Sequence, residues 1–232
     1  MNLSNAHKYL ILSCICLPLL FSSCKWDMPN NNSVLFNQTE DAEQITPIVA
    51  TPDVGRDVWQ KPDHVIRELG DISDKTIVDI GAGTGYFSFR LAFKAAKVIA
   101  VEIDKQAISE IENSKLRLPV KYQERLFTRL AKDDDPMLQE NEADAIVIIN
   151  TIAFIKNIPA YLNTLKKGLK DGGMIMIVDY KMKKLPIDAP PKTERVYLDR
   201  VEEMLEQVGY SEIRTNDTSL DYQYILTAIN NK

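Results

Sequence analysis

The sequence predicts an α/β fold: a doubly wound, mostly parallel sheet of seven strands in a single domain. From Thr76 onward, apolar runs typical of buried strands alternate with amphipathic runs typical of helices, the order that builds parallel β-α-β units. The last two strand-like runs are joined by a connection with no helical pattern, which favours a C-terminal antiparallel hairpin. A chain of 232 residues, 45% hydrophobic and 26% charged, suits one domain with one large core.

Each expected element has its own signal. The run DAIVIIN is nearly all apolar, as in a central strand covered on both faces, and Gly209 is a natural end for the last helix. Strands are expected at 76–80, 97–102, 120–122, 144–150, 174–179, 212–214 and 222–229. Helices are expected at 84–96, 105–115, 159–169 and 193–208.

Composition excludes several classes of function. The net charge of −5, with both signs mixed along the chain, gives no general attraction to nucleic acid. The three cysteines lie in the first 24 residues and His64 is the only histidine beyond them. Zinc sites built from Cys and His, and Cys–His or Ser–His nucleophile pairs, are therefore not expected in the body, and no metal is predicted.

The first residues resemble a bacterial lipoprotein signal. A polar start with Lys8 is followed by about a dozen apolar residues, too few for a comfortable membrane span, and then by Ser22, Ser23 and Cys24. The resemblance implies a signal peptide over 1–23 and acylation of Cys24. Residues 24–53 contain Pro47, scattered acids and no apolar period, which indicates a flexible tether before a domain over 54–232. An ordinary signal peptide, an uncleaved anchor and a packed arm are the alternatives.

Three glycines follow the first strand at every second position: Gly81, Gly83 and Gly85. The dinucleotide pattern G-x-G-x-x-G needs its third glycine one place later, so neither register of this chain matches it. Asp79 stands two residues before the first glycine. Glu102 ends the next strand about 20 residues on, where a carboxylate can accept hydrogen bonds from both hydroxyls of a ribose.

The loop with its preceding acid resembles motif I of class I S-adenosylmethionine-dependent methyltransferases, and the resemblance covers about residues 55–229. It implies that the loop lies under the methionine part of the cofactor, with Asp79 near its ammonium group. The cofactor-binding residues predicted are Asp79, Gly81, Ala82, Gly83, Gly85, Glu102, Ile103 and Asn150. An NAD-type protein and a lipid-anchored nucleoside-binding module without catalysis remain alternatives.

The acceptor of the methyl group is not encoded in any motif. A base is needed only when the nucleophile still carries a proton, so a catalytic residue need not be visible in the sequence. Asn150 is followed by Thr-Ile-Ala, whereas similar enzymes that methylate amino groups of DNA or glutamine have Pro-Pro-Tyr there. We therefore expect a small-molecule acceptor and no nucleic acid. Asp179 and Tyr180 are the candidates for contact with it.

Two further segments are expected near the cofactor because of this resemblance. Arg56, Trp59 and Gln60 precede the first strand, where the fold often carries a lid. Asp135 lies in the region from which a carboxylate approaches the adenine amino group in similar enzymes. Its alternative interpretation is a solvated turn.

The predicted leader and the predicted cofactor point to different compartments, because S-adenosylmethionine is made in the cytoplasm. The leader predicts a lipoprotein of a bacterial envelope, attached to the membrane through Cys24. The alternatives are an inner-membrane anchor with the domain inside, or a cytoplasmic protein whose translation starts at Met28. The sequence indicates neither the membrane nor the oligomeric state.

Overall fold

The computed structural model describes residues 55–232. The predictions for the signal peptide, for Cys24 and for the tether fall outside the described residues. Everything below concerns the described part of the chain.

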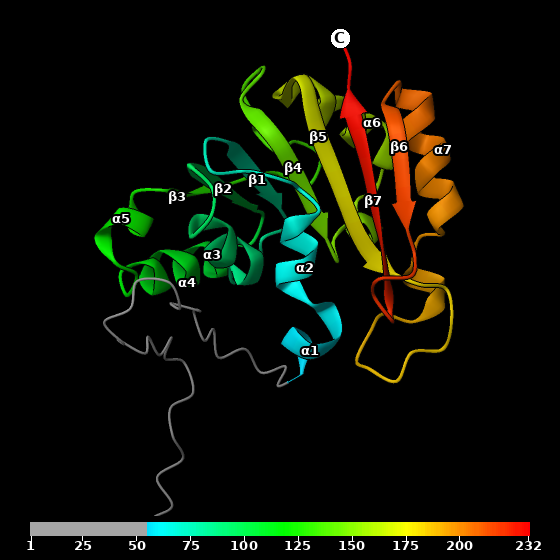
Figure 1. The fold of residues 1–232 in the computed structure, drawn as a ribbon, viewed down its shortest axis with the longest axis horizontal. Coiled ribbons are helices and arrows are strands. Elements are labelled where there is room, and N and C mark those ends of the chain that lie inside the picture. Colours follow the sequence, from blue (N-terminus) through cyan, green and yellow to red (C-terminus); the bar gives the residue numbers. More distant parts are fainter. Residues whose placement is uncertain (1–54) are drawn as a thin grey trace, which may run out of the picture. The chain divides into compact units, whose positions relative to one another are not determined.

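The described residues form one seven-stranded sheet with the strand order β3-β2-β1-β4-β5-β7-β6 (Figure 1). The strands from β3 to β5 run parallel, whereas β7 pairs antiparallel with both β5 and β6. The predicted fold, including the C-terminal antiparallel hairpin, is therefore confirmed. The strands are β1 Thr76–Ile80, β2 Lys97–Glu102, β3 Leu126–Leu130, β4 Ala143–Ile149, β5 Leu169–Tyr180, β6 Ser211–Asn216 and β7 Gln223–Asn230.

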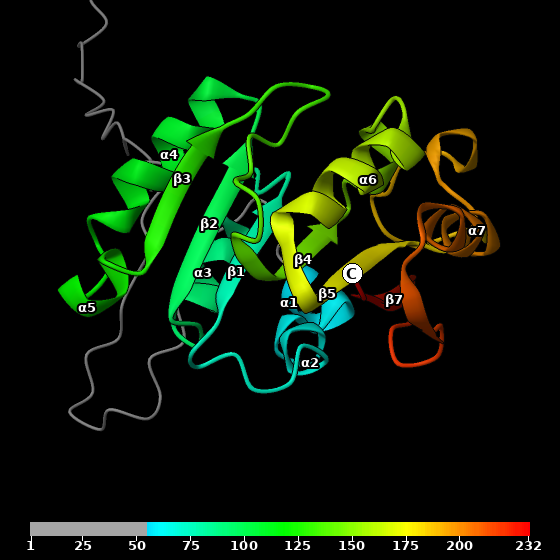
Figure 2. The same cartoon turned by 90° about the horizontal axis from the view of Figure 1, so that it is seen from above.

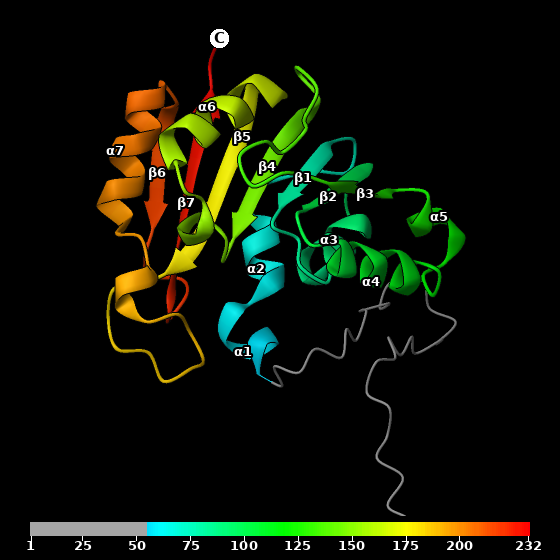
Figure 3. The same ribbon diagram turned by 180° about the vertical axis from the view of Figure 1, so that it is seen from behind.

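Helices cover both faces of the sheet. Figure 2 shows α6 and α7 on one side of the sheet, with α1, α2 and α3 on the other, and Figure 3 shows α6 and α7 from their own side. The helices are α1 Arg56–Gln60, α2 Pro62–Arg67, α3 Tyr86–Ala92, α4 Lys105–Lys115, α5 Val120–Gln123, α6 Ile158–Gly168 and α7 Leu198–Val208, with short 3-10 turns η1 Ile152–Phe154 and η2 Lys192–Glu194.

The alternation of strand side chains divides the core into two layers, as the pleat requires. On one face, Ile77 and Val98 pack with Phe87 of α3 and Ile111 of α4. On the other face, residues such as Val78 pack with side chains from α6 and α7. All of these side chains are buried, and the two layers together fix the sheet between its helices.

One predicted strand is wrong. Residues 120–122 begin the short helix α5, whose N-cap is Pro119, and the third strand is β3 at Leu126–Leu130. Val120 is 67% exposed and has no core face to join. β3 lies at the edge of the sheet, and only Leu126 of its five residues is buried. The strand therefore lacks the continuous apolar run by which the central strands were predicted.

The predicted helix at 193–208 also begins later than expected. Residues 192–194 form η2, and α7 starts at Leu198. Arg195 is extended there and donates from its guanidinium to the backbone oxygens of Pro190, Lys181 and Lys183. These bonds hold the segment that follows β5 against its own strand end.

The sheet order reverses between β1 and β4, because β1 lies between β2 and β4. In an open α/β sheet, ligands bind beyond the carboxyl ends of the strands at such a switch point. In Figure 1 the arrowheads of β4 and β5 mark the carboxyl ends of these strands, and they point towards the end of the sheet near which α1 lies. The residues that follow β1, β2 and β4 are therefore brought together at this edge.

Candidate active site

Two adjoining cavities lie at this switch point. The larger, of about 410 Å³, is lined by residues that follow β1, β2, β3 and β4, with Tyr161 of α6. The smaller, of about 190 Å³, is lined by the glycine loop, the start of α3, Arg56 and Asp79. Gly81, Asn150 and Thr151 line both. The two cavities therefore meet where β1 and β4 end, and an elongated ligand can extend through both.

The three glycines serve different purposes. Gly81 has a φ of +70°, and a Cβ there would lie 2.4 Å from the Thr151 side chain. Gly85 has a φ of +92°, and a Cβ there would lie 2.7 Å from Phe89 of α3. Gly83 has a φ of +55° but no atom within 4 Å of its Cβ position. Only at Gly83, which lines the smaller cavity, does the missing side chain leave open space for a ligand.

Asp79 is buried in β1 and lines the smaller cavity. The Ser88 hydroxyl donates to its Oδ2 over 2.6 Å. Burial raises the pKa of Asp79 to about 6, against the opposing effects of the Ser88 hydrogen bond and the Arg56 charge. A buried carboxylate at a cavity wall gains most from a cationic ligand group, because such a group offsets its lost hydration.

Glu102 lines the larger cavity and is already hydrogen-bonded to backbone. Its Oε2 accepts from the Gly83 N–H over 2.8 Å, and its Oε1 accepts from the N–H groups of Ile103 and Asp104. The carboxylate thus fixes the glycine loop to the end of β2. A carboxylate has about four lone-pair sites, so acceptor capacity remains for a ligand.

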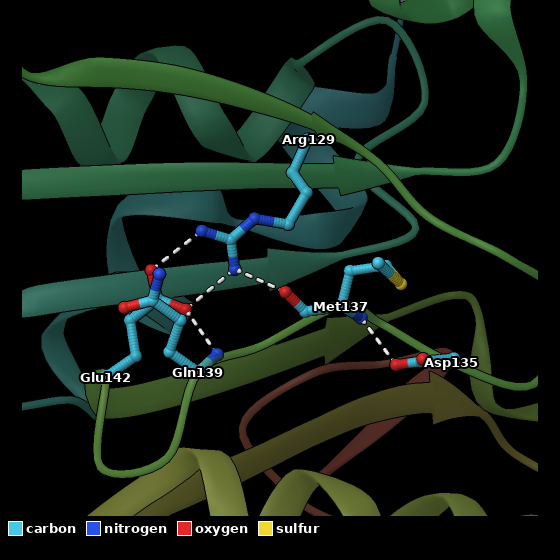
Figure 4. A network of polar contacts seen from close by, with 5 residues as sticks. All are labelled: Arg129, Asp135, Met137, Gln139 and Glu142. Carbon is cyan, nitrogen blue, oxygen red and sulfur yellow. Dashed lines mark hydrogen bonds and ion pairs between the residues drawn. The ribbon is translucent and has the colours of Figure 1, made fainter.

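The loop between β3 and β4 supplies the far wall of the larger cavity, and Figure 4 shows what holds it. Arg129 makes two 2.7 Å hydrogen bonds to the Glu142 carboxylate and a third bond to the Met137 backbone oxygen. This contact lowers the pKa of Glu142 and raises that of Arg129. Asp135 accepts from the Met137 N–H within the same loop, and Asp133 is the carboxylate that lines the cavity.

The larger cavity also has apolar and aromatic walls. Ile103 and Phe154 line it and are 55% and 67% exposed, which is unusual for side chains of this size. Tyr161 is buried, and that burial raises its pKa to about 12. Two apolar side chains left open at a cavity mouth suit a flat, weakly polar ring.

Helix α1 is fastened to α3 at the smaller cavity. Asp57 accepts hydrogen bonds from the Tyr86 hydroxyl and, over 2.7 Å, from Arg90. The Tyr86 ring carries the Arg56 guanidinium at 4.0 Å and the Arg90 guanidinium at 3.9 Å from its centroid. Of the predicted lid segment, Arg56 lines the cavity that contains Asp79, whereas Trp59 and Gln60 are buried and line neither cavity.

A chain of carboxamides joins α1 to the ends of β4 and β7. Arg56 Nε donates to Gln60 Oε1 over 2.6 Å, and Gln60 Nε2 donates to Gln223 Oε1 over 2.9 Å and to Asn150 Oδ1 over 3.3 Å. Gln223 Nε2 also donates to Asn150 Oδ1. Gln60 and Gln223 are fully buried. The sequence argument missed Gln223, because an isolated glutamine at the start of a predicted strand carries no motif.

Asp179 and Tyr180 line neither cavity. Asp179 is 2% exposed; its Oδ1 accepts from the Tyr180 N–H, and burial raises its pKa to about 6. Tyr180 packs its ring 6.1 Å from that of Trp59. In contrast, seven of the predicted cofactor-binding residues line at least one cavity. They are Asp79, Gly81, Ala82, Gly83, Glu102, Ile103 and Asn150. Gly85 lines neither and permits the close packing of α3.

Two features are absent from the described residues. Over 55–232, no three His, Cys, Asp or Glu side chains are grouped so that they could hold a metal ion. No helix in this part of the chain has both the length and the apolar character needed to cross a membrane.

Comparison with known proteins gives several matches to methyltransferases. A family model described as "Methyltransferase domain" matches residues 78–175. The tRNA U34 carboxymethyltransferase of Actinobacillus pleuropneumoniae is 24% identical over 171 residues, which is 69% of this chain and 52% of that protein. The ubiquinone biosynthesis O-methyltransferase of Alkalilimnicola ehrlichii is 22% identical over 116 residues, 49% of this chain and 45% of that protein. The chain thus spans about half the length of these curated relatives.

Among solved structures, a SAM-dependent methyltransferase from Aquifex aeolicus superimposes with a TM-score of 0.69 at 21% identity, covering 77% of this chain and 94% of that one. The matches support the predicted enzyme class and the predicted cofactor, with an acceptor that they leave unspecified. The described residues of this chain have the fold of a SAM-dependent methyltransferase.

Proposed function

We propose that the protein is an S-adenosylmethionine-dependent methyltransferase that transfers the methyl group directly to a small-molecule acceptor. The observation that carries the proposal is the pair of cavities joined at the ends of β1 and β4, with a buried carboxylate at one and a second carboxylate at the other. The family match over residues 78–175 includes both carboxylates.

The side chains around the smaller cavity fit the methionine part of the cofactor. Asp79 would face its ammonium group, and the Arg56 guanidinium at the same cavity would face its carboxylate. Gly83 leaves its Cβ position open, so ligand atoms can approach the backbone there. The ammonium and carboxylate groups of the cofactor would thus each face a side chain of the opposite charge.

The larger cavity fits the nucleoside part. Glu102 ends β2, where its free lone pairs can accept from two ribose hydroxyls. Ile103 and Phe154 would enclose the adenine ring, and burial of their exposed faces would favour binding. Asp133 lies at the same wall.

Such a site would contribute to catalysis by positioning the reacting atoms and by excluding water from them. When bound, the cofactor supplies an electrophilic methyl group on a sulfonium. Asn150 and Thr151, which line both cavities, would hold the reacting atoms in line, and α1 would keep water from them because Asp57 fastens it to α3. A base is needed only when the attacking atom still carries a proton, so the proposal assigns no side chain as a general base.

The proposal is tested by calorimetry with S-adenosylhomocysteine and, separately, with NAD. Glu102→Ala should weaken S-adenosylhomocysteine by about 1.5–3 kcal/mol, because two ribose hydroxyls lose a charged acceptor, which is roughly ten- to a hundredfold in Kd. Glu206→Ala, on the exposed face of α7, is the matched control and should bind normally. Tight NAD binding with no S-adenosylhomocysteine signal would overturn the proposal. Cofactor binding without methyl transfer to any acceptor would favour the non-catalytic binding module.

We also propose that the mature chain is attached to a bacterial membrane through an acylated Cys24. The support is the sequence alone: a short apolar run, two serines and then the cysteine. Cys24→Ser should move the protein from the membrane fraction to the soluble fraction or leave an unprocessed leader. Mass spectrometry of the intact native protein separates an acylated Cys24 from a start at Met28. Acylation would be refuted if Cys24→Ser kept the same membrane fraction and differed in mass only by the exchange of sulfur for oxygen.

A further inference from the structure

Asn150 lies at the junction of the two cavities. It follows β4 directly, has a left-handed backbone with a φ of +58°, and lines both cavities. Its backbone N–H donates to the Val178 oxygen of β5, so the residue is fixed to the sheet. Asparagine is among the few non-glycine residues that adopt this backbone readily.

The orientation of the Asn150 carboxamide follows from the chemistry of its neighbours. An amide can be turned so that its oxygen and nitrogen exchange places, but a guanidinium only donates. Arg56 Nε therefore requires Gln60 Oε1 beside it, which turns Gln60 Nε2 towards Gln223 and Asn150. Gln60 Nε2 in turn requires oxygens in front of it, which are Gln223 Oε1 and Asn150 Oδ1.

The same reasoning fixes the last bond. Because Gln223 Oε1 faces Gln60, Gln223 Nε2 faces Asn150 and donates to its Oδ1. Within residues 55–232, every hydrogen bond to the Asn150 side chain ends on Oδ1. Two donors occupy that oxygen, and Nδ2 is the end of the carboxamide left for a ligand. Asn150 thus offers N–H donors and no acceptor at the junction of the cavities.

We infer that Asn150 selects an acceptor whose attacking atom is a deprotonated oxygen or sulfur, which receives a hydrogen bond from Nδ2. Gln60 and Gln223 are positioning residues that act through Asn150. The inference rests on the proposed methyltransferase function. An amine or amide acceptor is favoured by an oxygen that receives its N–H, and the Asn150 side-chain oxygen is already occupied from two sides.

The partners of the cavity carboxylates agree with this assignment. Asp79 is bonded to Ser88, Glu102 to the Gly83 N–H, and Asp133 to Lys156. An acceptor that arrives deprotonated needs no base. Its lone pair forms the bond to the methyl carbon, the carbon–sulfur bond breaks, and that electron pair returns to sulfur. The anion becomes a neutral ether, ester or thioether, and no proton moves.

The test uses thiophenol and aniline, which share a phenyl ring and differ in the attacking atom. At pH 8 thiophenol is an anion without a donor, whereas aniline is neutral and carries two N–H donors. Calorimetry measures the binding of each probe to the complex with S-adenosylhomocysteine, in which no turnover occurs. Turnover with S-adenosylmethionine is then measured and divided by the rate of the same reaction without protein.

Three variants sharpen the comparison. Asn150→Asp replaces the Nδ2 donor by an anionic oxygen of the same shape. Gln223→Glu replaces one of the two donors to Asn150 Oδ1 by a carboxylate oxygen, which favours a turned carboxamide with Nδ2 towards residue 223. Gln207→Glu makes the same chemical change on the exposed face of α7 and is the control.

The wild-type complex should bind thiophenol and not aniline. Asn150→Asp should weaken thiophenol about tenfold or more, Gln223→Glu should reduce the preference for thiophenol over aniline, and Gln207→Glu should change neither. The wild-type comparison decides the matter even where a variant does not fold. A complex that binds aniline as well as thiophenol, or binds neither, overturns the inference. Absence of S-adenosylhomocysteine binding would instead overturn the proposed function.

Discussion

Replacement of Asp79 by asparagine should stabilise the protein and weaken its cofactor at the same time. Burial raises the pKa of this carboxyl from 3.8 to about 6, a difference of about 2 pH units. At ~1.36 kcal/mol per unit, the ionised group costs about 3 kcal/mol of folding free energy at pH 8. Asparagine keeps the shape of the side chain and can still accept from Ser88. Its buried N–H₂ group is unfavourable, however, and offsets part of the gain from removing the charge. We expect a net gain of about 1–3 kcal/mol, which is several °C in Tm.

The pH dependence of this gain has a definite sign. Between pH 3.8 and about 6, the native protein keeps the Asp79 proton while the unfolded chain releases it. The wild-type protein therefore loses stability from this group as the pH rises through that window, and the loss is complete above it. Asp79→Asn does not titrate. The difference in Tm between variant and wild type should be small at pH 4 and reach a plateau above pH 6.

Asp179→Asn is the matched control. Asp179 is also buried, its pKa is also raised to about 6, and it lines neither cavity. Both variants should show the same pH-dependent change in melting temperature by differential scanning calorimetry. Only Asp79→Asn should weaken S-adenosylmethionine, by roughly tenfold or more, because the ammonium group loses its charged partner. The reasoning is refuted if Asp79→Asn binds the cofactor normally, or if the gain in stability is as large at pH 4 as at pH 8.

Two glycine variants separate ligand contact from packing. Gly83→Ala should cost about 1 kcal/mol of stability, because alanine is strained at this positive φ but meets no atom within 4 Å. S-adenosylhomocysteine should bind more weakly, because the new methyl group occupies the cavity. Normal affinity in calorimetry would place the ligand elsewhere. Gly85→Ala should cost more, about 2–4 kcal/mol, because its methyl also meets Phe89 at 2.7 Å, whereas the affinity of the folded fraction should stay within a few fold; a selective loss of affinity would contradict the packing role.

The sequence was sufficient where a structural requirement is local. The glycine loop, Asp79 and Glu102 are defined by spacing along one β-α-β unit, and in the structure Asp79, Gly83 and Glu102 each line one of the two cavities. The apolar run at 144–150 was recognisable because β4 is central and covered on both faces. The edge strand β3 was missed because only Leu126 of its five residues is buried.

Long-range partners could not be inferred from the sequence. Gln60 and Gln223 are 163 residues apart, and neither carries a local pattern, yet both are fully buried and bonded to each other. Asp135 fitted the expected position in the chain, but its carboxylate accepts from Met137 within its own turn and Asp133 faces the cavity. Such outcomes depend on which side chain the fold turns inward, and that is fixed by tertiary packing.

The two halves of the site follow from different kinds of information. The cofactor contacts that we propose at Asp79, Gly83 and Glu102 all lie within one β-α-β unit, so a short motif is enough to encode them. The orientation of Asn150, which we infer to contact the methyl acceptor, instead depends on Gln60 of α1 and Gln223 of β7, and the Arg56 guanidinium sets the direction of the chain of carboxamides. On this inference, a substitution at Gln223 should alter acceptor choice without changing the glycine loop.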